Sequence, residues 1–213
     1  MKPRFTTVAL ILLIGSLIGG CYKYRISDVQ AQFEATGKYS VVVASLDQRQ
    51  FIVDKTSPDT YVGMVRGFFG NPWNFTTMSG LPFSDDVSQA ICNSLSRKGF
   101  TAKLVSVKFD LTEEKVRERL LSNKEDRALL VIIRKWESDT YANMNVGYDL
   151  ILKVIAKDGT ILATAQARDE VHVPSNIMAA PVYMSEKEVP NIFKKSIESL
   201  LNNPDIVKVL ASN

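Results

Sequence analysis

The sequence predicts an α+β fold, a two-layer sandwich in which a mixed sheet of about five strands carries helices mainly on one face. Residues 39–109 contain a strand, a helix and a strand, an order that favours a parallel pair joined by a crossover. Residues 128–173 contain three apolar or alternating segments, and turns separate them, which favours an antiparallel meander. A final amphipathic helix would supply the second layer.

The first half of the predicted fold begins with a buried strand at Tyr39–Leu46, a β-branched run that ends at a turn. A short extended segment is expected at Phe51–Val53. A helix is expected from Ser84 to Lys98, because Ser84 is a good N-cap and Asp85-Asp86 places negative charge at the positive end of the helix dipole. Gly99 would end this helix.

The second half is assigned from periodicity and turn chemistry. Asp158-Gly159 is a strong hairpin signal, so the strands on either side of it should pair. A proline at position 190 lies too deep for a helix that starts at Ser185, so the regular part of the last helix is expected nearer Val189. The expected elements are a strand at 103–109, a helix at 110–123, a strand at 128–133 that residues 135–137 extend, strands at 144–156 and 160–173, an irregular loop at 174–184, and a helix within 185–201.

Residues 60–83 form the least regular stretch, with a single charge, Arg66, among many glycine, proline and aromatic residues. Such a composition disrupts helical and strand periods, and a long connection in a compact domain is usually functional. The stretch is either a flap that fills the core or a recognition surface, since aromatic side chains on an adaptable backbone suit partner binding. The candidate contact residues are Arg66, Phe68, Phe69, Trp73 and Phe75.

The N-terminus has the features of an export signal. Lys2 and Arg4 precede an apolar run at Val8–Ile18, which is shorter than the roughly 20 residues of a membrane-spanning helix. The sequence Gly19-Gly20-Cys21 that follows resembles the lipobox of bacterial lipoproteins, in which small residues precede an acylated cysteine. The alternative is an ordinary signal peptide with a cysteine nearby by chance.

The resemblance to a lipobox implies three segments: a signal peptide at 1–20, a lipidated N-terminus and tether at 21–38, and one periplasmic α+β domain at 39–213. Acyl chains on Cys21 would give a permanent membrane anchor, because two or more chains hold a protein stably. Tyr22 occupies the position at which aspartate tends to retain lipoproteins at the inner membrane. The expected location is therefore the outer membrane, with the domain facing the periplasm.

Composition and single residues argue against several classes of function. The formal net charge of +3 falls to +1 without Lys2 and Arg4, so the chain is not a nucleic-acid-binding protein by charge. The single histidine, His172, has apolar neighbours and is expected at a strand end, and Cys92 is expected to be partly buried. We therefore expect no catalytic residues, no metal site and no cofactor.

Several motifs together resemble the YajG-type family of uncharacterised bacterial lipoproteins. They are the lipobox, the strand Val-Val-Val-Ala-Ser-Leu-Asp-Gln-Arg, the loop Phe69-Gly70-Asn71-Pro72, the helix start at 81–86, and the strand 148–156 with its Lys157-Asp158-Gly159 turn. The layout is more distantly similar to periplasmic modules of the curli-channel type and to the N-terminal domain of TolB. The resemblance implies a fold and a location and assigns no catalytic residue.

Two functional hypotheses remain from the sequence. In the first, a non-enzymatic, lipid-anchored module binds another envelope protein through residues 60–83, with Arg66, Phe69 and Trp73 as the main contacts. In the second, the domain carries or senses a small amphiphile such as a lipid or glycan fragment, and residues 60–83 form a lid. Exposed aromatic residues without a cavity beneath them would favour the first hypothesis.

Overall fold

The computed structural model describes residues 23–67, 69–174 and 181–211 of the chain. The leader, Cys21 and Phe68 lie outside these residues. The strands are β1 Lys23–Tyr24, β2 Ser40–Asp47, β3 Tyr61–Arg66, β4 Pro72–Thr77, β5 Thr101–Leu104, β6 Arg127–Thr140, β7 Met144–Ala156 and β8 Ile161–Val173. The helices are α2 Gln50–Val53, α3 Phe83–Ser96, α4 Glu113–Leu121, α5 Pro181–Leu201 and α6 Pro204–Ala211.

The α+β class is confirmed, and in the described residues the sheet has eight strands. β6, β7 and β8 form the predicted antiparallel meander, and β2 and β5 form the predicted parallel pair around α3. The Asp158-Gly159 turn is present, and Gly159 has a φ of 87°, a value that side chains disfavour. The sheet exceeds the expected five strands because β1, β3 and β4 arise from segments read as irregular.

β6 is the strand through which the whole sheet is connected. Its residues 127–133 pair in parallel with β2, and Asp139 and Thr140 pair in parallel with β3 along the same edge. β7 pairs along the other edge for its full length. The sheet therefore divides into two arms, one made by β2 and β5 and the other by β3, β4 and β1.

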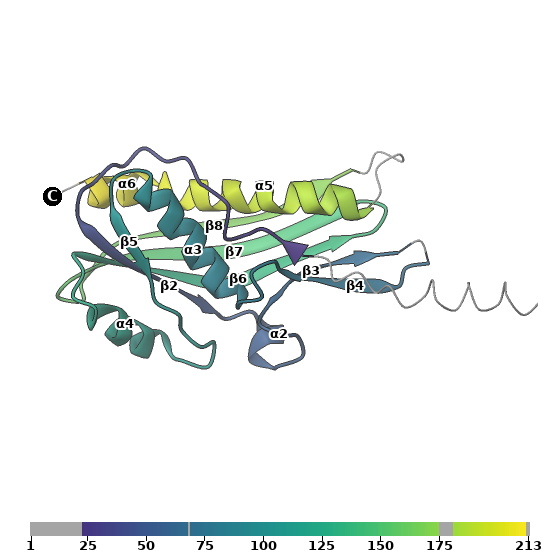
Figure 1. Ribbon diagram of the computed structural model, residues 1–213, viewed down its shortest axis with the longest axis horizontal. Coiled ribbons are helices and arrows are strands. Elements are labelled where there is room, and N and C mark those ends of the chain that lie inside the picture. Colours follow the sequence, from purple (N-terminus) through teal and green to yellow (C-terminus); the bar gives the residue numbers. More distant parts are fainter. Residues whose placement is uncertain (1–22, 68, 175–180, 212–213) are drawn as a thin grey trace, which may run out of the picture.

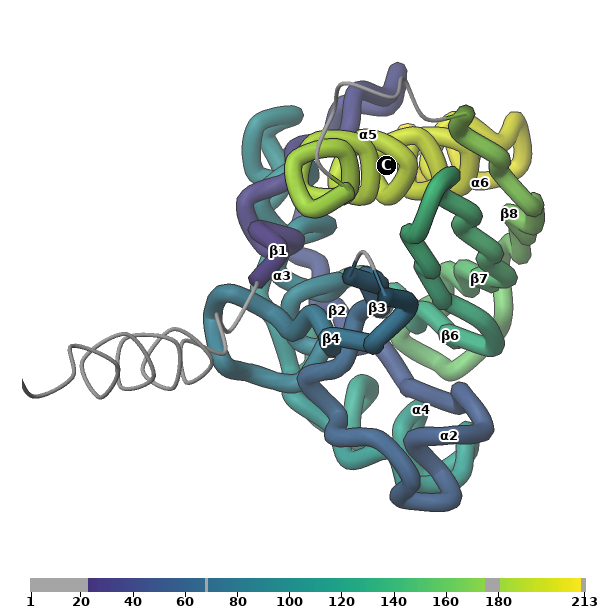
Figure 2. Tube along the Cα trace, turned by 90° about the vertical axis from the view of Figure 1, so that its right-hand side faces the viewer, coloured from purple at the N-terminus to yellow at the C-terminus, as the bar shows by residue number. Residues whose placement is uncertain are grey.

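The helices cover both faces of the curled sheet, with most of them on one face, as expected. α5 and α6 lie on one side of the sheet and α4 on the other, as Figures 1 and 2 show. The larger core lies between the sheet and helices α3, α5 and α6 and includes Trp136 and Phe193. A smaller core lies under α4 and includes Val116 and Leu120. Ala163, Ala165 and Ala167 on β8 are buried in the larger core.

The segment from Lys23 to Lys38 differs from the tether that the sequence predicts. It crosses the helical layer and buries every second residue or nearly so: Tyr24, Ile26, Ala31, Phe33 and Ala35. Its backbone is bonded to helix side chains, since Ala31 N donates to Ser94 Oγ (2.9 Å) and Gln32 N donates to Glu198 Oε1 (2.8 Å). Because buried apolar area and satisfied backbone groups both stabilise it, the segment is part of the folded body.

Three other expectations need correction. Phe51–Val53 lies in the short helix α2 rather than in an extended segment. The predicted strand 103–109 is limited to β5, because its partner β2 pairs only with residues 101–104. The last helix begins at Pro181, earlier than predicted, and keeps Pro190 inside it. Pro190 lacks the N–H that would bond the carbonyl four residues earlier, and packing of the helix on the sheet compensates for this loss.

Candidate interaction surface

Four exposed aromatic residues gather at one end of the sheet, which we call the aromatic end: Phe69, Trp73, Tyr141 and Tyr183. Their exposed fractions are 91%, 43%, 46% and 66%. They are the only aromatic residues among the exposed large hydrophobic residues of the described chain. Exposed aromatic groups of this kind mark interaction sites more often than scattered aliphatic side chains do.

The topology of the sheet brings these residues together from distant parts of the sequence. β3 runs parallel to β6, with Val65 opposite Thr140, so the β3–β4 connection lies beside the β6–β7 turn that carries Tyr141. β8 ends at the same place, since Val173 pairs with Met144. The first turns of α5 lie above this end in Figure 1, and Ser185 there hydrogen-bonds the Tyr24 hydroxyl.

Residues 61–77 form a β-hairpin, so the irregular loop predicted for residues 60–83 is wrong over most of its length. Arg66 pairs with Pro72, and Gly67 N donates to Asn71 O (2.9 Å) to close the turn. Gly70 has a φ of 78°, which glycine adopts without strain. The dense glycine and proline content therefore belongs to a turn and a bulged strand pair.

Arg66 holds the hairpin to the central strand. Its Nε donates to Asp139 Oδ1 (3.0 Å) and its Nη2 donates to Asp139 Oδ2 (2.7 Å), a two-point geometry on β6. The hydrogen bonds from Arg66 to Asp139, followed by the Asp139 charge, raise the pKa of the Arg66 guanidinium. The guanidinium is committed to this structural pair, with about a third of each side chain exposed.

The predicted contact residues separate into surface and core positions. Phe69 and Trp73 are exposed, as a recognition surface requires. Phe75 is fully buried and stacks on Tyr24 with ring centroids 4.6 Å apart, so its ring belongs to the core. Phe68 lies outside the described residues. The sequence left open whether residues 60–83 fill the core or form a recognition surface. The hairpin does both, since Phe75 fills the core and Phe69 and Trp73 are exposed.

A buried ion pair fixes the base of the hairpin. Arg49 donates from Nη1 to the carbonyl of Tyr61, the first residue of β3 (2.8 Å), and holds Asp47 through Nε and Nη2 (2.9 and 2.7 Å). The guanidinium also lies 4.6 Å from the ring centroid of Phe83 at the start of α3. The strands β2 and β3 and the helix α3 therefore meet at this buried charge pair. A buried pair is tolerated only when hydrogen bonds satisfy both of its charged groups.

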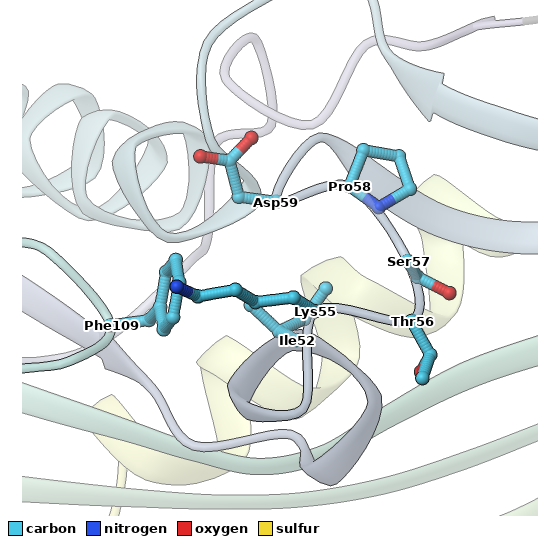
Figure 3. Close-up of a pocket in the computed structure, with 7 residues that line it drawn as sticks. All are labelled: Ile52, Lys55, Thr56, Ser57, Pro58, Asp59 and Phe109. Carbon is cyan, nitrogen blue, oxygen red and sulfur yellow. The ribbon is translucent and has the colours of Figure 1, made fainter.

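Two adjoining clefts lie elsewhere, at the C-terminal ends of β2 and β5. One, of about 450 Å³, is lined by residues 52 and 55–59 and by Phe109, and Figure 3 shows Lys55 extending toward Phe109. The other, of about 440 Å³, shares Asp59 and Phe109 and includes Pro82 and Ser84. Residues 61–77 line neither of them, so in these two clefts the hairpin is not a lid.

The titratable groups that could carry chemistry do not form a reactive set, because Asp86 and Cys92 are buried on α3 and His172 lies at the end of β8. Burial raises the pKa of the Cys92 thiol to about 12, and Cys92 lies in the larger core, as predicted. Burial also raises the pKa of Asp86 to about 6, against the opposing hydrogen bond from Ser79. His172 is at the end of β8, where its Nδ1 lies 2.8 Å from Asn145 Oδ1. Among the described residues, no group of three metal-binding side chains occurs.

Sequence reasoning missed Tyr141 and Tyr183, which complete the aromatic end. Tyr141 follows the long strand β6, and the predicted strand 128–133 stopped too early to place it at a turn beside β3. Tyr183 lies in the first turn of α5, which the sequence assigned to a loop. Neither position carries a local signal, because Tyr141 is placed by pairing between distant strands and Tyr183 by packing of α5 on the sheet.

Comparison with known proteins shows the fold and leaves the family open. No family model matches the chain, and no curated protein matches it. A Xanthomonas campestris protein, XCC0632 of the family DUF330, has a similar structure with a TM-score of 0.52 and 14% identity, over 85% of this chain and 94% of that one. At this identity the likeness shows a shared fold alone.

Two further solved structures are similar to a lesser degree. The PelC dodecamer from Paraburkholderia phytofirmans gives a TM-score of 0.42 and 13% identity, over 82% of this chain and 96% of that one. The lipoprotein GNA1162 from Neisseria meningitidis gives 0.30 and 9%, over 75% and 94%. Separately, none of the helices in the described part of the chain has the length and apolar character needed to cross a membrane.

Proposed function

We propose that this protein is a lipoprotein of the bacterial outer membrane, anchored through Cys21, whose periplasmic domain binds another envelope protein and catalyses no reaction. The observation that carries the proposal is the aromatic end, where Phe69 and Trp73 are exposed on a hairpin whose base is fixed in the core. Aromatic side chains have few rotatable bonds and lose little conformational entropy on binding, which suits a recognition surface.

The leader sequence supports the location. A basic start, a short apolar run and a cysteine after two glycines together resemble a lipobox, and Tyr22 favours sorting to the outer membrane. The same motif, with the strand and turn motifs of residues 41–49, 69–72 and 148–159, is the basis for placing the chain in the YajG-type family. Anchoring raises the local concentration of the domain for any partner at that membrane.

The geometry favours partner binding over the carriage of an amphiphile. A lid must detach, whereas this hairpin is bonded to β6 through Arg66 and Asp139 and to β1 through its second strand. Its buried ring, Phe75, packs on Tyr24 rather than over a cleft. Absence of catalysis is proposed because Cys92 and Asp86 are buried on α3, whereas the exposed His172 lies at the end of β8.

Crosslinking in cells tests the proposal. Replacement of Trp73 by a photoreactive phenylalanine should capture one or a few envelope proteins that mass spectrometry identifies. The matched control carries the same group at Ile161, which has a similar exposed fraction, 41% against 43%, at the opposite end of the sheet. Capture of no protein from position 73, or of the same set from both positions, would count against a binding role. Loss of palmitate-analogue labelling in Cys21→Ala tests the anchor separately.

A further inference from the structure

The folded body of the protein begins only two residues after the proposed anchor. Lys23 pairs with Thr76 in the sheet, and Tyr24 is 1% exposed. The Tyr24 carbonyl accepts a hydrogen bond from Met78 N (2.9 Å), and its hydroxyl bonds Ser185 on α5. The position of the chain is therefore fixed from Lys23 onward by strand pairing, ring stacking and a helix.

Chain length then limits how far the domain stands from the membrane. The two Cα–Cα steps from Cys21 to Lys23 span at most about 7 Å, whereas a free tether over residues 21–38 would span up to about 60 Å. An acylated Cys21 has its chains in the hydrocarbon layer, so its backbone lies at the headgroup layer. A body attached by so short a link touches the membrane surface and has a restricted orientation.

The direction of β1 decides which side of the body faces the membrane. β1 runs parallel to β4, and Lys23 and Tyr24 pair with Thr76 and Thr77. The chain therefore enters β1 from the side on which β4 begins, at Pro72 beside the hairpin turn. Trp73 lies three residues before Thr76, a separation of roughly 10 Å along the strand.

The side chains at this end have the chemistry of a membrane interface. Tryptophan and tyrosine concentrate at headgroup depth because their rings are amphipathic, and the aromatic end presents Trp73, Tyr141 and Tyr183 together with Phe69. The same strand order that brings these residues together also places the start of β1, which follows the proposed anchor, beside them. Lys23, exposed at the entry point, adds a positive charge that anionic headgroups attract.

We propose that the aromatic end lies in the headgroup layer of the membrane that holds the lipid anchor, with Trp73 and Phe69 among the lipid headgroups. This inference rests on the anchor of the proposed function and deepens it. A protein bound at this end would itself be embedded in, or anchored to, the same membrane. The opposite end of the sheet, with the β7–β8 turn, points away from the membrane.

Fluorescence quenching tests this orientation, because the chain has two tryptophans and one of them, Trp136, is fully buried. Lipidated full-length protein is reconstituted into vesicles of phosphatidylethanolamine and phosphatidylglycerol, with or without bromine on the acyl chains near the headgroups. Trp73→Phe reports Trp136 alone. We expect brominated lipid to lower the Trp73 emission roughly twofold and to leave the Trp73→Phe protein nearly unchanged.

Two matched variants place a new tryptophan at either end of the sheet in the Trp73→Phe background. Tyr141→Trp should be quenched, and Ile161→Trp, at a position of similar exposure, should not. Quenching of both, or of neither while the protein floats with the vesicles, would overturn the orientation and leave the anchor intact. Protein that fails to float would overturn both the anchor and this inference. If the photoreactive group at position 73 captures a protein but brominated lipid does not quench Trp73, the aromatic end binds a protein and does not lie in the lipid.

Discussion

Removal of the buried Arg49 charge should destabilise the protein more than removal of any surface charge. Arg49 is 1% exposed, and Asp47, which it holds through two nitrogen atoms, is 3% exposed. Arg49→Met leaves the Asp47 carboxylate buried without a cation and also removes the donor to the Tyr61 carbonyl. Breaking a buried pair in this way costs about 3–5 kcal/mol, a large share of a typical 5–15 kcal/mol of stability.

Urea unfolding followed by the fluorescence of buried Trp136 measures this loss as a shift in the unfolding midpoint. The matched control is Arg66→Met. Arg66 contacts Asp139 with nearly the same two-point geometry (3.0 and 2.7 Å), but about a third of each side chain is exposed. In Arg66→Met, water screens the Asp139 carboxylate that remains, so the urea midpoint of this control should move much less than that of Arg49→Met.

A double variant separates the buried charge from the shape of the site. Asp47→Leu combined with Arg49→Met replaces both charges by apolar groups of similar size, and most of the lost stability should return, because no charge is then left unpaired. An Arg49→Met protein as stable as Arg66→Met would refute the reasoning. A double variant as unstable as the single one would show that packing at the site matters and the buried charge does not.

Three further predictions address other parts of the fold. Tyr24→Ala removes the ring that stacks on Phe75 and should cost about 3–5 kcal/mol and expose the N-terminal segment to trypsin, whereas Tyr24→Phe should stay protected. Gly63→Ala places a Cβ in a clash with Ser138 Oγ and should lower the thermal midpoint, by the equivalent of about 1–3 kcal/mol. Gly70→Ala, where nothing lies near the added Cβ, tests the strain of a positive φ without a clash. Asp86 has its folded-state pKa raised from 3.8 to about 6, so its contribution to stability is present below about pH 4 and is lost as pH rises through 6. Asp86→Asn should therefore gain of the order of 1 kcal/mol over the natural protein at pH 7.5 and nothing at pH 4, and an equal change at both pH values would contradict the assignment.

The sequence predicts the elements whose periodicity is local and strong. α3 follows from its acidic first turn and apolar stripe, and the β6–β8 meander follows from alternation and the Asp158-Gly159 turn. The N-terminal segment carried a signal too, since Ala31, Phe33 and Ala35 alternate with polar residues, but its mixed charge indicated a linker. It is ordered because it packs on α3 and α5, elements far away in the sequence.

The exposed and buried aromatic residues of the hairpin could not be told apart from the sequence. Phe69 is 91% exposed and Phe75 is fully buried, although both lie in the same glycine- and proline-rich stretch. Phe69 lies in the turn between β3 and β4, whereas Phe75 lies in β4, where it pairs with Gly63 and its ring stacks on Tyr24 from the neighbouring strand. Register between β1, β3 and β4 depends on β6, so no local rule supplies it.

The fork of the sheet at β6 has a consequence for the timing of assembly. A chain that emerges from its N-terminus during synthesis delivers the β2–β5 pair and the β3–β4 hairpin before β6, the strand that both arms pair with, has emerged. Closure of such long-range contacts is slow and late. The Tyr24–Ser185 contact forms only after α5 is present, so acylation at the proposed anchor would precede the step that fixes Lys23 and Tyr24 in the fold.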